Sequence, residues 1–191
     1  YPVMLDQILS IISPQHGGSF IDCTFGGGGY SSAILQYPDT KVFAIDRDKL
    51  AKKYASNLTK KFPKRFTFFQ EKFSNLNKVI SSELNPKAII FDLGLSSNQL
   101  LDLQRGFSFN SKGTLSMQMG DNKYSAYDVV NSFDKRQLAN IIKILGEEKD
   151  AKIIASKIVN YRLRKKIETS EELSSIIKSA KKKKYINKKN P

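Results

Sequence analysis

The chain has few of the residues that most often build metal sites, disulfides and proton relays. Its 191 residues include one cysteine, one histidine and no tryptophan. The single Cys23 cannot form an internal disulfide, and its place in an apolar segment predicts a buried, reduced thiol and a cytoplasmic location. His16 lies in the polar stretch PQHGG, where a surface-loop role is expected. We therefore expect neither histidine-based catalysis nor a metal site.

Long apolar runs are also missing. No segment reaches the ~20 residues that cross a membrane, and no signal-peptide pattern is present. Hydrophobic residues nevertheless make up 40% of the chain, within the range of globular proteins. We therefore expect a folded protein with no membrane partner, and the length suits one domain with a core or a domain with an appendage.

Acidic residues are too few to balance the basic ones. The formal net charge is +14, and residues 141–191 carry 15 Lys and Arg against 6 Asp and Glu. A basic end on a folded body favours a polyanionic partner, most often a nucleic acid. The alternative is a lysine-rich composition in which the lysines are simply solvated.

The first hundred residues alternate between strand and helix patterns. Apolar runs that read as strands cover residues 19–24, 41–46, 65–70 and 87–92. Stretches with helical spacing cover residues 5–12, 32–36, 51–62 and 76–84. Repeated strand–helix units with right-handed crossovers predict an α/β fold with a parallel, doubly wound sheet.

The second half loses this alternation. Residues 101–124 read as a loop, and helices are predicted over residues 126–133, 135–145 and 150–164, with a last helix from Thr169. Asp134 is an expected N-cap, and Thr169 with Glu172 forms an expected capping box. We therefore divide the chain into an α/β domain, residues 1–100, and a basic, mostly helical domain, residues 101–191.

A run of four glycines, Gly26–Gly29, joins the first strand to a helix in IDCTFGGGGYSSAIL. Glycines here let a ligand approach the backbone N–H groups, and a following helix N-terminus favours negative charge. Asp46 ends the second strand eighteen positions after Gly28, where a carboxylate can accept both hydroxyls of a ribose. These features predict a nucleoside-containing ligand at the carboxyl edge of the sheet.

The acid before the glycines bears on which nucleoside is bound. GGGGYS only approximates G-x-G-x-x-G, because Ser31 occupies the sixth place. Asp22 lies four residues before Gly26, where it can meet the methionine ammonium of S-adenosylmethionine and would repel a pyrophosphate. We therefore favour S-adenosylmethionine over NAD, and a structural role for Asp22 in capping the turn is the alternative.

The fourth predicted strand ends in DLGLSSNQ, at the same sheet edge. In an open α/β sheet this edge faces the ligand crevice, so Asp92 and Gln99 can reach the cofactor or the substrate. The alternative for Asp92 is a cap on the following turn. The D/N-P-P-Y signature of many amino-methylating enzymes is absent from this position.

Several motifs occur in the order and spacing of one protein family. They are PVMLDQIL, DCTFGGGGYS, AIDRD, KFS, DLGLSSNQL, RGFSF and GEE. On these motifs the chain resembles the bacterial small-subunit (16S) ribosomal RNA cytosine-N4 methyltransferases called RsmH or MraW. The resemblance covers essentially the whole chain, and DLGLSSNQL followed by RGFSF is its most specific part.

The resemblance implies a Rossmann-like methyltransferase sheet with a helical substrate domain inserted after the fourth strand. It implies an enzyme that methylates a cytidine N4 amine in the RNA of the 30S particle. Asp46 would then hold the ribose, and Phe73 would lie beside the adenine. The implied cofactor contacts are Gly28, Gly29, Tyr30, Asp46, Phe73, Asp92 and Gln99.

Two further expectations concern the reaction and the RNA. Asp92 could accept a hydrogen bond from the N4 amine and orient its lone pair, which makes it the candidate catalytic residue. Basic side chains of the second domain are plausible phosphate contacts that would give affinity and not base choice. They are Arg105, Lys157, Arg162, Arg164, Lys165, Lys166 and the lysine run 181–184.

The chain departs from the family pattern in two places. Lys112–Met119 reads KGTLSMQM where the family has D-G-P-L-D-M-R-M, and only four strands are counted against seven in a complete fold. The chain also starts at Tyr1 without a methionine, so we expect a fragment with an unfinished sheet. These departures motivate an alternative function, a catalytically idle relative that binds RNA or ribosomes. An NAD-dependent oxidoreductase fits the glycines and Asp46 but leaves RGFSF and the basic helices unexplained.

Overall fold

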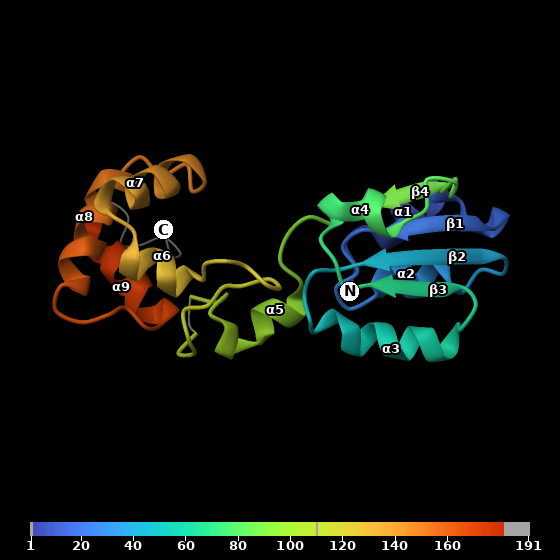
Figure 1. Ribbon diagram of the computed structural model, residues 1–191, viewed down its shortest axis with the longest axis horizontal. Helices are drawn as coiled ribbons and strands as arrows, with labels where there is room; N and C mark the ends of the chain where they lie inside the picture. The colour runs from blue at the N-terminus through green and yellow to red at the C-terminus, as the bar shows by residue number, and fades with distance from the viewer. Residues whose placement is uncertain (1, 110, 182–191) are drawn as a thin grey trace. The chain divides into compact units, whose positions relative to one another are not determined.

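The computed structural model describes residues 2–109 and 111–181, and it divides into two compact units. Tyr1–Asn98 forms the first unit and Gln99–Pro191 the second. The first unit contains a parallel sheet with helices, and the second is built from helices and loops (Figure 1). No helix within the described residues has the length and apolar character needed to span a membrane.

A four-stranded parallel sheet forms the centre of the first unit. Its strands are β1 (Gly18–Asp22), β2 (Thr40–Ile45), β3 (Phe66–Phe69) and β4 (Ala88–Ile90), in the order β3-β2-β1-β4. The chain therefore adds strands on one side of β1 and then crosses to the other side. Loops that leave the strands on the two sides of this switch point diverge and open a crevice at the carboxyl edge. The predicted Rossmann-like α/β sheet is confirmed.

One face of this sheet carries the core of the first unit. Phe20 pairs in register with Val42 and Ala88, and Val42 pairs with Phe66, so these apolar side chains form one row. Three helices supply side chains that pack against this core: α1 (Leu5–Ile12), α2 (Gly29–Ile34) and α3 (Ala51–Lys61). Each large apolar side chain buried in this way stabilises the fold by about 1.5–3 kcal/mol.

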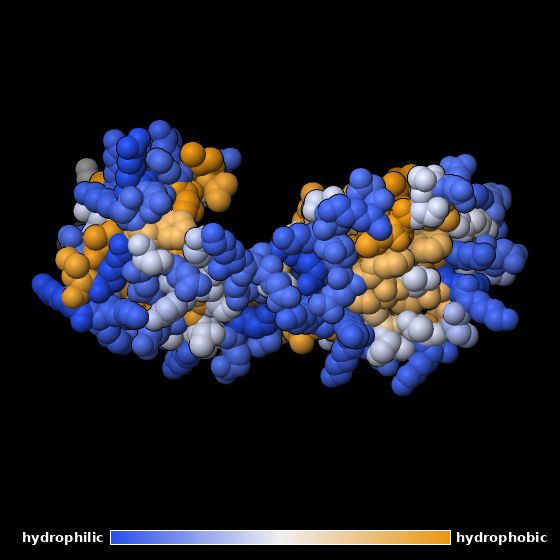
Figure 2. Space-filling view, viewed as in Figure 1, coloured by the Kyte–Doolittle hydropathy of each residue, from blue (hydrophilic) through white to orange (hydrophobic). Residues whose placement is uncertain are grey.

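The helix predicted over residues 76–84 is much shorter than expected. After the 3-10 turn η2 (Phe73–Asn75), helix α4 covers only Leu76–Val79. Ile80 is extended, and the Ser81 hydroxyl accepts a hydrogen bond from the Glu83 N–H, so a turn replaces the helix. Ile89 on the second face of the sheet stays 45% exposed, and Figure 2 shows apolar surface over the strands of this unit.

The helices predicted for the second half of the chain are present among its described residues. They are α6 (Ala126–Ser132), α7 (Lys135–Ile144), α8 (Ala151–Arg162) and α9 (Ser170–Ala180). Both predicted caps are present: Asp134 accepts from the Gln137 N–H, and Thr169 forms a capping box with Glu172. The core of this unit shares no residue with that of the first and includes Leu115, Leu138, Ile154, Ile158, Ile167 and Ile176.

Among the described residues of the predicted loop, residues 101–124, the structure has the last residue of α5 (Ser97–Leu101) and the 3-10 turn η3 (Leu103–Arg105). The segment that departs from the family pattern packs into the second unit, because Leu115 is fully buried there. The N–H of Leu115 donates to the Glu168 carbonyl at 2.8 Å. A Cβ at Gly106 would lie 2.6 Å from the Thr114 carbonyl oxygen, so RGFSF and this segment are closely packed.

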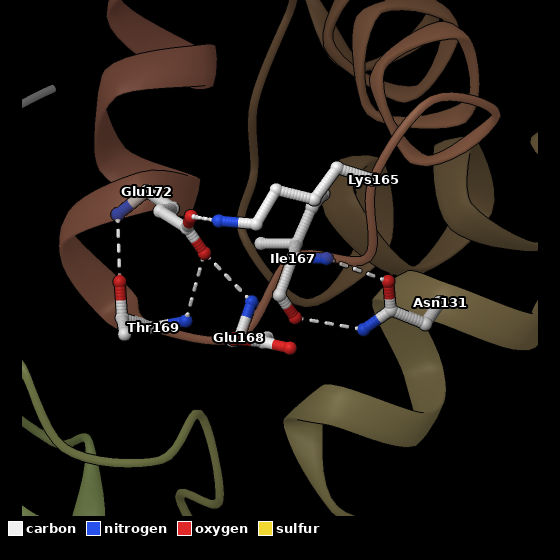
Figure 3. Close-up of polar contacts among 6 residues, drawn as sticks. All are labelled: Asn131, Lys165, Ile167, Glu168, Thr169 and Glu172. Atoms are coloured by element: carbon white, nitrogen blue, oxygen red, sulfur yellow. Dashed lines mark hydrogen bonds and ion pairs between the residues drawn. The ribbon is translucent and has the colours of Figure 1, made fainter.

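The connection between α8 and α9 is held by two side chains. The Asn131 amide, at the end of α6, donates to the Ile167 carbonyl at 2.8 Å and accepts from the Ile167 N–H at 2.9 Å (Figure 3). Glu172 accepts hydrogen bonds from the Glu168 N–H and from the Lys165 ammonium (Figure 3). These contacts satisfy backbone groups around the fully buried Ile167.

Candidate functional site

Three carboxylates lie at the carboxyl edge of the sheet. Asp22 is the last residue of β1, Asp46 directly follows β2, and Asp92 lies two residues after the end of β4. The four glycines connect β1 to α2 at the same edge. The candidate site of the first unit is therefore where the switch-point geometry predicts a ligand crevice.

The carboxylate of Asp46 is fixed against the glycine loop. Its Oδ2 accepts from the Gly26 N–H at 2.6 Å, and its Oδ1 accepts from the Asp48 N–H at 2.8 Å. Burial raises the pKa of Asp46, and these two hydrogen bonds oppose the rise. Since a carboxylate oxygen has two acceptor positions, each oxygen retains one that a pair of ribose hydroxyls can use.

The glycines are needed for different physical reasons. Gly26 and Gly28 have φ angles of 53° and 80°, in the left-handed region that favours glycine. A Cβ at Gly29 would lie 2.8 Å from the Pro2 ring, because the N-terminal segment packs on the loop. The Tyr30 hydroxyl donates to the Val3 carbonyl in the same segment, and burial raises the pKa of this hydroxyl. Tyr30 thus joins the N-terminus to the glycine loop.

Asp22 makes the contacts of a turn-stabilising residue. It is buried, it accepts from the Ser31 hydroxyl at 2.7 Å, and it accepts from the Thr24 N–H at 3.2 Å. Burial raises the pKa of Asp22 to about 6, and the two hydrogen bonds reduce the rise. Cys23 is buried, as expected, and burial raises the pKa of its thiol to about 11. These contacts support the alternative interpretation, in which Asp22 stabilises the turn after β1.

Phe73 and Asp92 are both exposed near the end of β4. Phe73 packs edge-on against Phe91, with ring centroids 5.6 Å apart at an interplanar angle of 87°. The N–H of Asp92 donates to the Thr24 hydroxyl at 2.7 Å, which ties this residue to the loop after β1. Sequence reasoning missed both Phe91 and Thr24. The alternation of β4 could have indicated Phe91, since it follows the buried Ile90 and points to the opposite face.

Gln99 and Arg105 belong to the second unit. Gln99 is buried within α5 at the division between the units. The Arg105 guanidinium donates to the Gln118 carbonyl at 2.6 Å and lies 5.2 Å from the centre of the Phe107 ring. Arg105 therefore holds two parts of the loop together in addition to any contact with RNA.

The predicted RNA-binding side chains differ in their internal contacts. The Arg162 guanidinium donates to the Val130 carbonyl at 2.7 Å, and Lys165 forms a 2.6 Å ion pair with Glu172. Lys157, Arg164 and Lys166 are exposed. Of the lysine run, Lys181 pairs with Glu148, and residues 182–184 lie outside the described residues. The described residues contain no cluster of His, Cys, Asp or Glu suited to a metal ion.

Comparisons with known proteins point to one family. The model of the MraW methylase family matches residues 1–191. Relatives named "Ribosomal RNA small subunit methyltransferase H" are 44% identical over 181 residues in a Wolbachia species from Drosophila simulans and 42% identical over 181 residues in Ehrlichia canis. Each match covers 93% of this chain but 62% and 61% of the relative, so the chain spans about three fifths of their length.

Proposed function

The chain belongs to the MraW methylase family, and from this premise we propose that it binds S-adenosylmethionine and methylates the N4 amine of a cytidine in small-subunit (16S) ribosomal RNA. The first unit binds the cofactor at the carboxyl edge of its sheet. The substrate is the RNA of the 30S particle, and the reaction takes place in the cytoplasm.

One observation carries the cofactor part of this proposal. The Asp46 carboxylate is held by the Gly26 and Asp48 N–H groups and keeps acceptor positions for the two ribose hydroxyls. Phe73 and Phe91 provide exposed apolar surface near the same edge, which suits an adenine ring. Gly28, Gly29 and Tyr30 would approach the nucleoside through the loop, and Gln99 would complete the set.

The residues of the chain bind and orient the reactants. S-adenosylmethionine supplies an electrophilic methyl group when it is bound, so little acid–base chemistry is required of the protein. Asp92 is exposed beside the loop, and its backbone is fixed by Thr24. Its carboxylate accepts one N4–H of the cytidine and directs the nitrogen lone pair toward the methyl group, an alignment worth several kcal/mol of barrier. The amine releases a proton after transfer.

The test separates cofactor binding from catalysis. S-adenosylmethionine is titrated into the chain by calorimetry, and methyl transfer to 30S particles is then measured, with mass mapping of the modified nucleotide. We expect Asp46→Asn to weaken cofactor binding at least tenfold, whereas Asp39→Asn, an exposed acid of the same unit, leaves it unchanged. No binding to the parent chain would contradict the proposal.

The catalytic role of Asp92 needs its own variant. We expect Asp92→Ala to bind the cofactor within about threefold of the parent and to transfer methyl groups at least ~100-fold more slowly. Full-rate transfer by this variant removes the role of Asp92. Cofactor binding by the parent chain without any transfer supports the idle RNA-binding relative, which the altered Lys112–Met119 segment motivates.

A further inference from the structure

A groove in the second unit is lined by five polar residues, three of them lysines, and by one apolar residue. It has a volume of about 380 Å³, and it lies where the start of α7 meets one side of α8. Its lining residues are Lys135, Lys152, Ile153, Ser156, Lys157 and Asn160.

The sequence explains why these residues gather. Lys152, Ser156 and Asn160 recur every four residues, so they lie along one face of α8, and Ile153 and Lys157 are next to them. The opposite face of α8 carries the buried Ile154 and Ile158, which pack into the same core as Leu138 of α7. This packing fixes the first residue of α7, Lys135, at the groove.

The positive charge of the groove is not neutralised from within. No carboxylate lines it. Among the described residues, no hydrogen bond or ion pair engages the side chains of Lys135, Lys152 and Lys157, and none engages those of Ser156 and Asn160. Other basic side chains nearby in sequence are engaged, such as Lys165 with Glu172.

We propose that this groove binds the phosphodiester backbone of the RNA substrate. The inference rests on the proposed function, which makes RNA the polyanion that the chain meets. The three ammonium groups neutralise successive phosphates, and Ser156 and Asn160 donate hydrogen bonds to phosphate oxygens. Ile153 is 46% exposed in the groove and offers apolar surface to a sugar or base. An acidic protein would not need this mixture of cations, neutral donors and apolar surface.

The test measures binding of a fluorescently labelled single-stranded RNA of about 12 nucleotides to the full chain by anisotropy, at about 50 to 400 mM KCl. The groove variant combines Lys135→Ala, Lys152→Ala and Lys157→Ala. The matched control combines Lys52→Ala, Lys53→Ala and Lys60→Ala on α3, which removes the same charge from three exposed positions of a helix in the other unit. Circular dichroism verifies that both variants fold.

We expect the groove variant to bind RNA about 100-fold more weakly at about 100 mM salt. The slope of log affinity against log salt should become shallower by about 2, because each phosphate contact contributes about 0.7 to the slope for single strands. The control should stay within about threefold with an unchanged slope. Ile153→Ser should weaken binding about threefold without changing the slope, because it removes apolar contact and no charge.

Three results would overturn the proposal. They are an unchanged affinity of the groove variant, an equal loss in the control, and equal competition by polyglutamate at matched charge. Calorimetry with S-adenosylmethionine on the same variants keeps this outcome separate from the proposed function. If the groove variant binds both the cofactor and RNA normally, only the RNA-binding role of the groove is refuted. If the parent chain binds RNA at the groove but does not bind the cofactor, only the proposed methylation is refuted.

Discussion

At the scale of single residues, the glycine loop offers a direct test of backbone conformation. Gly28 has a φ of 80°, and a Cβ there would lie 2.7 Å from the Phe25 ring. A Cβ at Gly27 would meet only the Asn98 amide nitrogen, at 3.2 Å, and Gly27 has no positive φ. We expect Gly28→Ala to destabilise the chain by about 2 kcal/mol or more, and Gly27→Ala to cost below ~1 kcal/mol. Urea unfolding without ligand measures both free energies of unfolding. Equal losses in the two variants would contradict the conclusion that the backbone conformation at Gly28 requires glycine.

The buried carboxyl of Asp22 makes stability depend on pH. Its pKa rises from the ordinary 3.8 to about 6 in the folded chain, chiefly through burial. The folded state therefore binds the proton more tightly than the unfolded state. The stability linked to this group is present below about pH 4 and is lost as the pH rises through about 6.

Asp22→Asn isolates this effect, because an amide of similar shape cannot ionise. We expect the stability of the variant relative to the parent to rise by about 2 kcal/mol between about pH 4.5 and pH 7.5. Urea unfolding at several pH values gives the difference, and Asp39→Asn, at an exposed acid, provides the comparison. A difference that does not change with pH would show that Asp22 titrates normally.

Sequence spacing could predict part of this site but not its internal contacts. The position of the glycines and of Asp46 at the carboxyl edge could be predicted because a strand–loop–helix unit fixes where they lie, and their contact with a cofactor stays a prediction. The hydrogen bond from Gly26 to Asp46 and that from Asp92 to Thr24 join segments that are far apart in sequence. Such pairs depend on how two loops approach each other, which no local pattern encodes. The hydrogen bond between Tyr30 and Val3 could not be predicted for the same reason.

At the scale of elements, helix starts were easier to predict than helix ends. The caps at Asp134 and Thr169 use side chains three residues apart, so the sequence carries the whole signal. The short α4 is different. Apolar residues at helical spacing continue to Leu84, but Ser81 supplies a competing turn that ends the helix after Val79. Local hydrogen bonds between a side chain and the backbone, such as this one, can decide where a marginal helix ends.

Asn131 connects two elements of the second unit and can be tested in isolation. Its side chain makes hydrogen bonds with both the N–H and the carbonyl of Ile167, a fully buried residue (Figure 3). Asn131→Ala leaves both backbone groups without this partner, so we expect a loss of about 2–3 kcal/mol in the free energy of unfolding. Asn140→Ala, an exposed position on α7, should cost below ~0.5 kcal/mol. Equal losses in thermal unfolding would show that the Asn131 contacts contribute nothing.

At the scale of the whole molecule, the two candidate sites lie in separate units. The carboxylates that we assign to the cofactor lie at the edge of the first unit's sheet, and the cationic groove lies on α7 and α8 of the second. The charge excess of residues 141–191 predicted a basic helical part but not the groove. A groove requires two helices to meet at a particular register, and only the packing of the second core sets that register.

The two cores share no residue, so a defect in one should act on its own unit. Leu138 of α7 is almost fully buried in the second core, whereas Leu145, at the end of the same helix, is 80% exposed. We expect Leu138→Ala to destabilise the second unit by about 2–5 kcal/mol. Amide hydrogen exchange in α8 and α9 should then quicken by roughly 30-fold or more, while exchange in β1 and β2 stays unchanged. Leu145→Ala removes the same atoms and should leave both units as they are. Faster exchange in the strands of the first unit would show that one cooperative core holds the chain together.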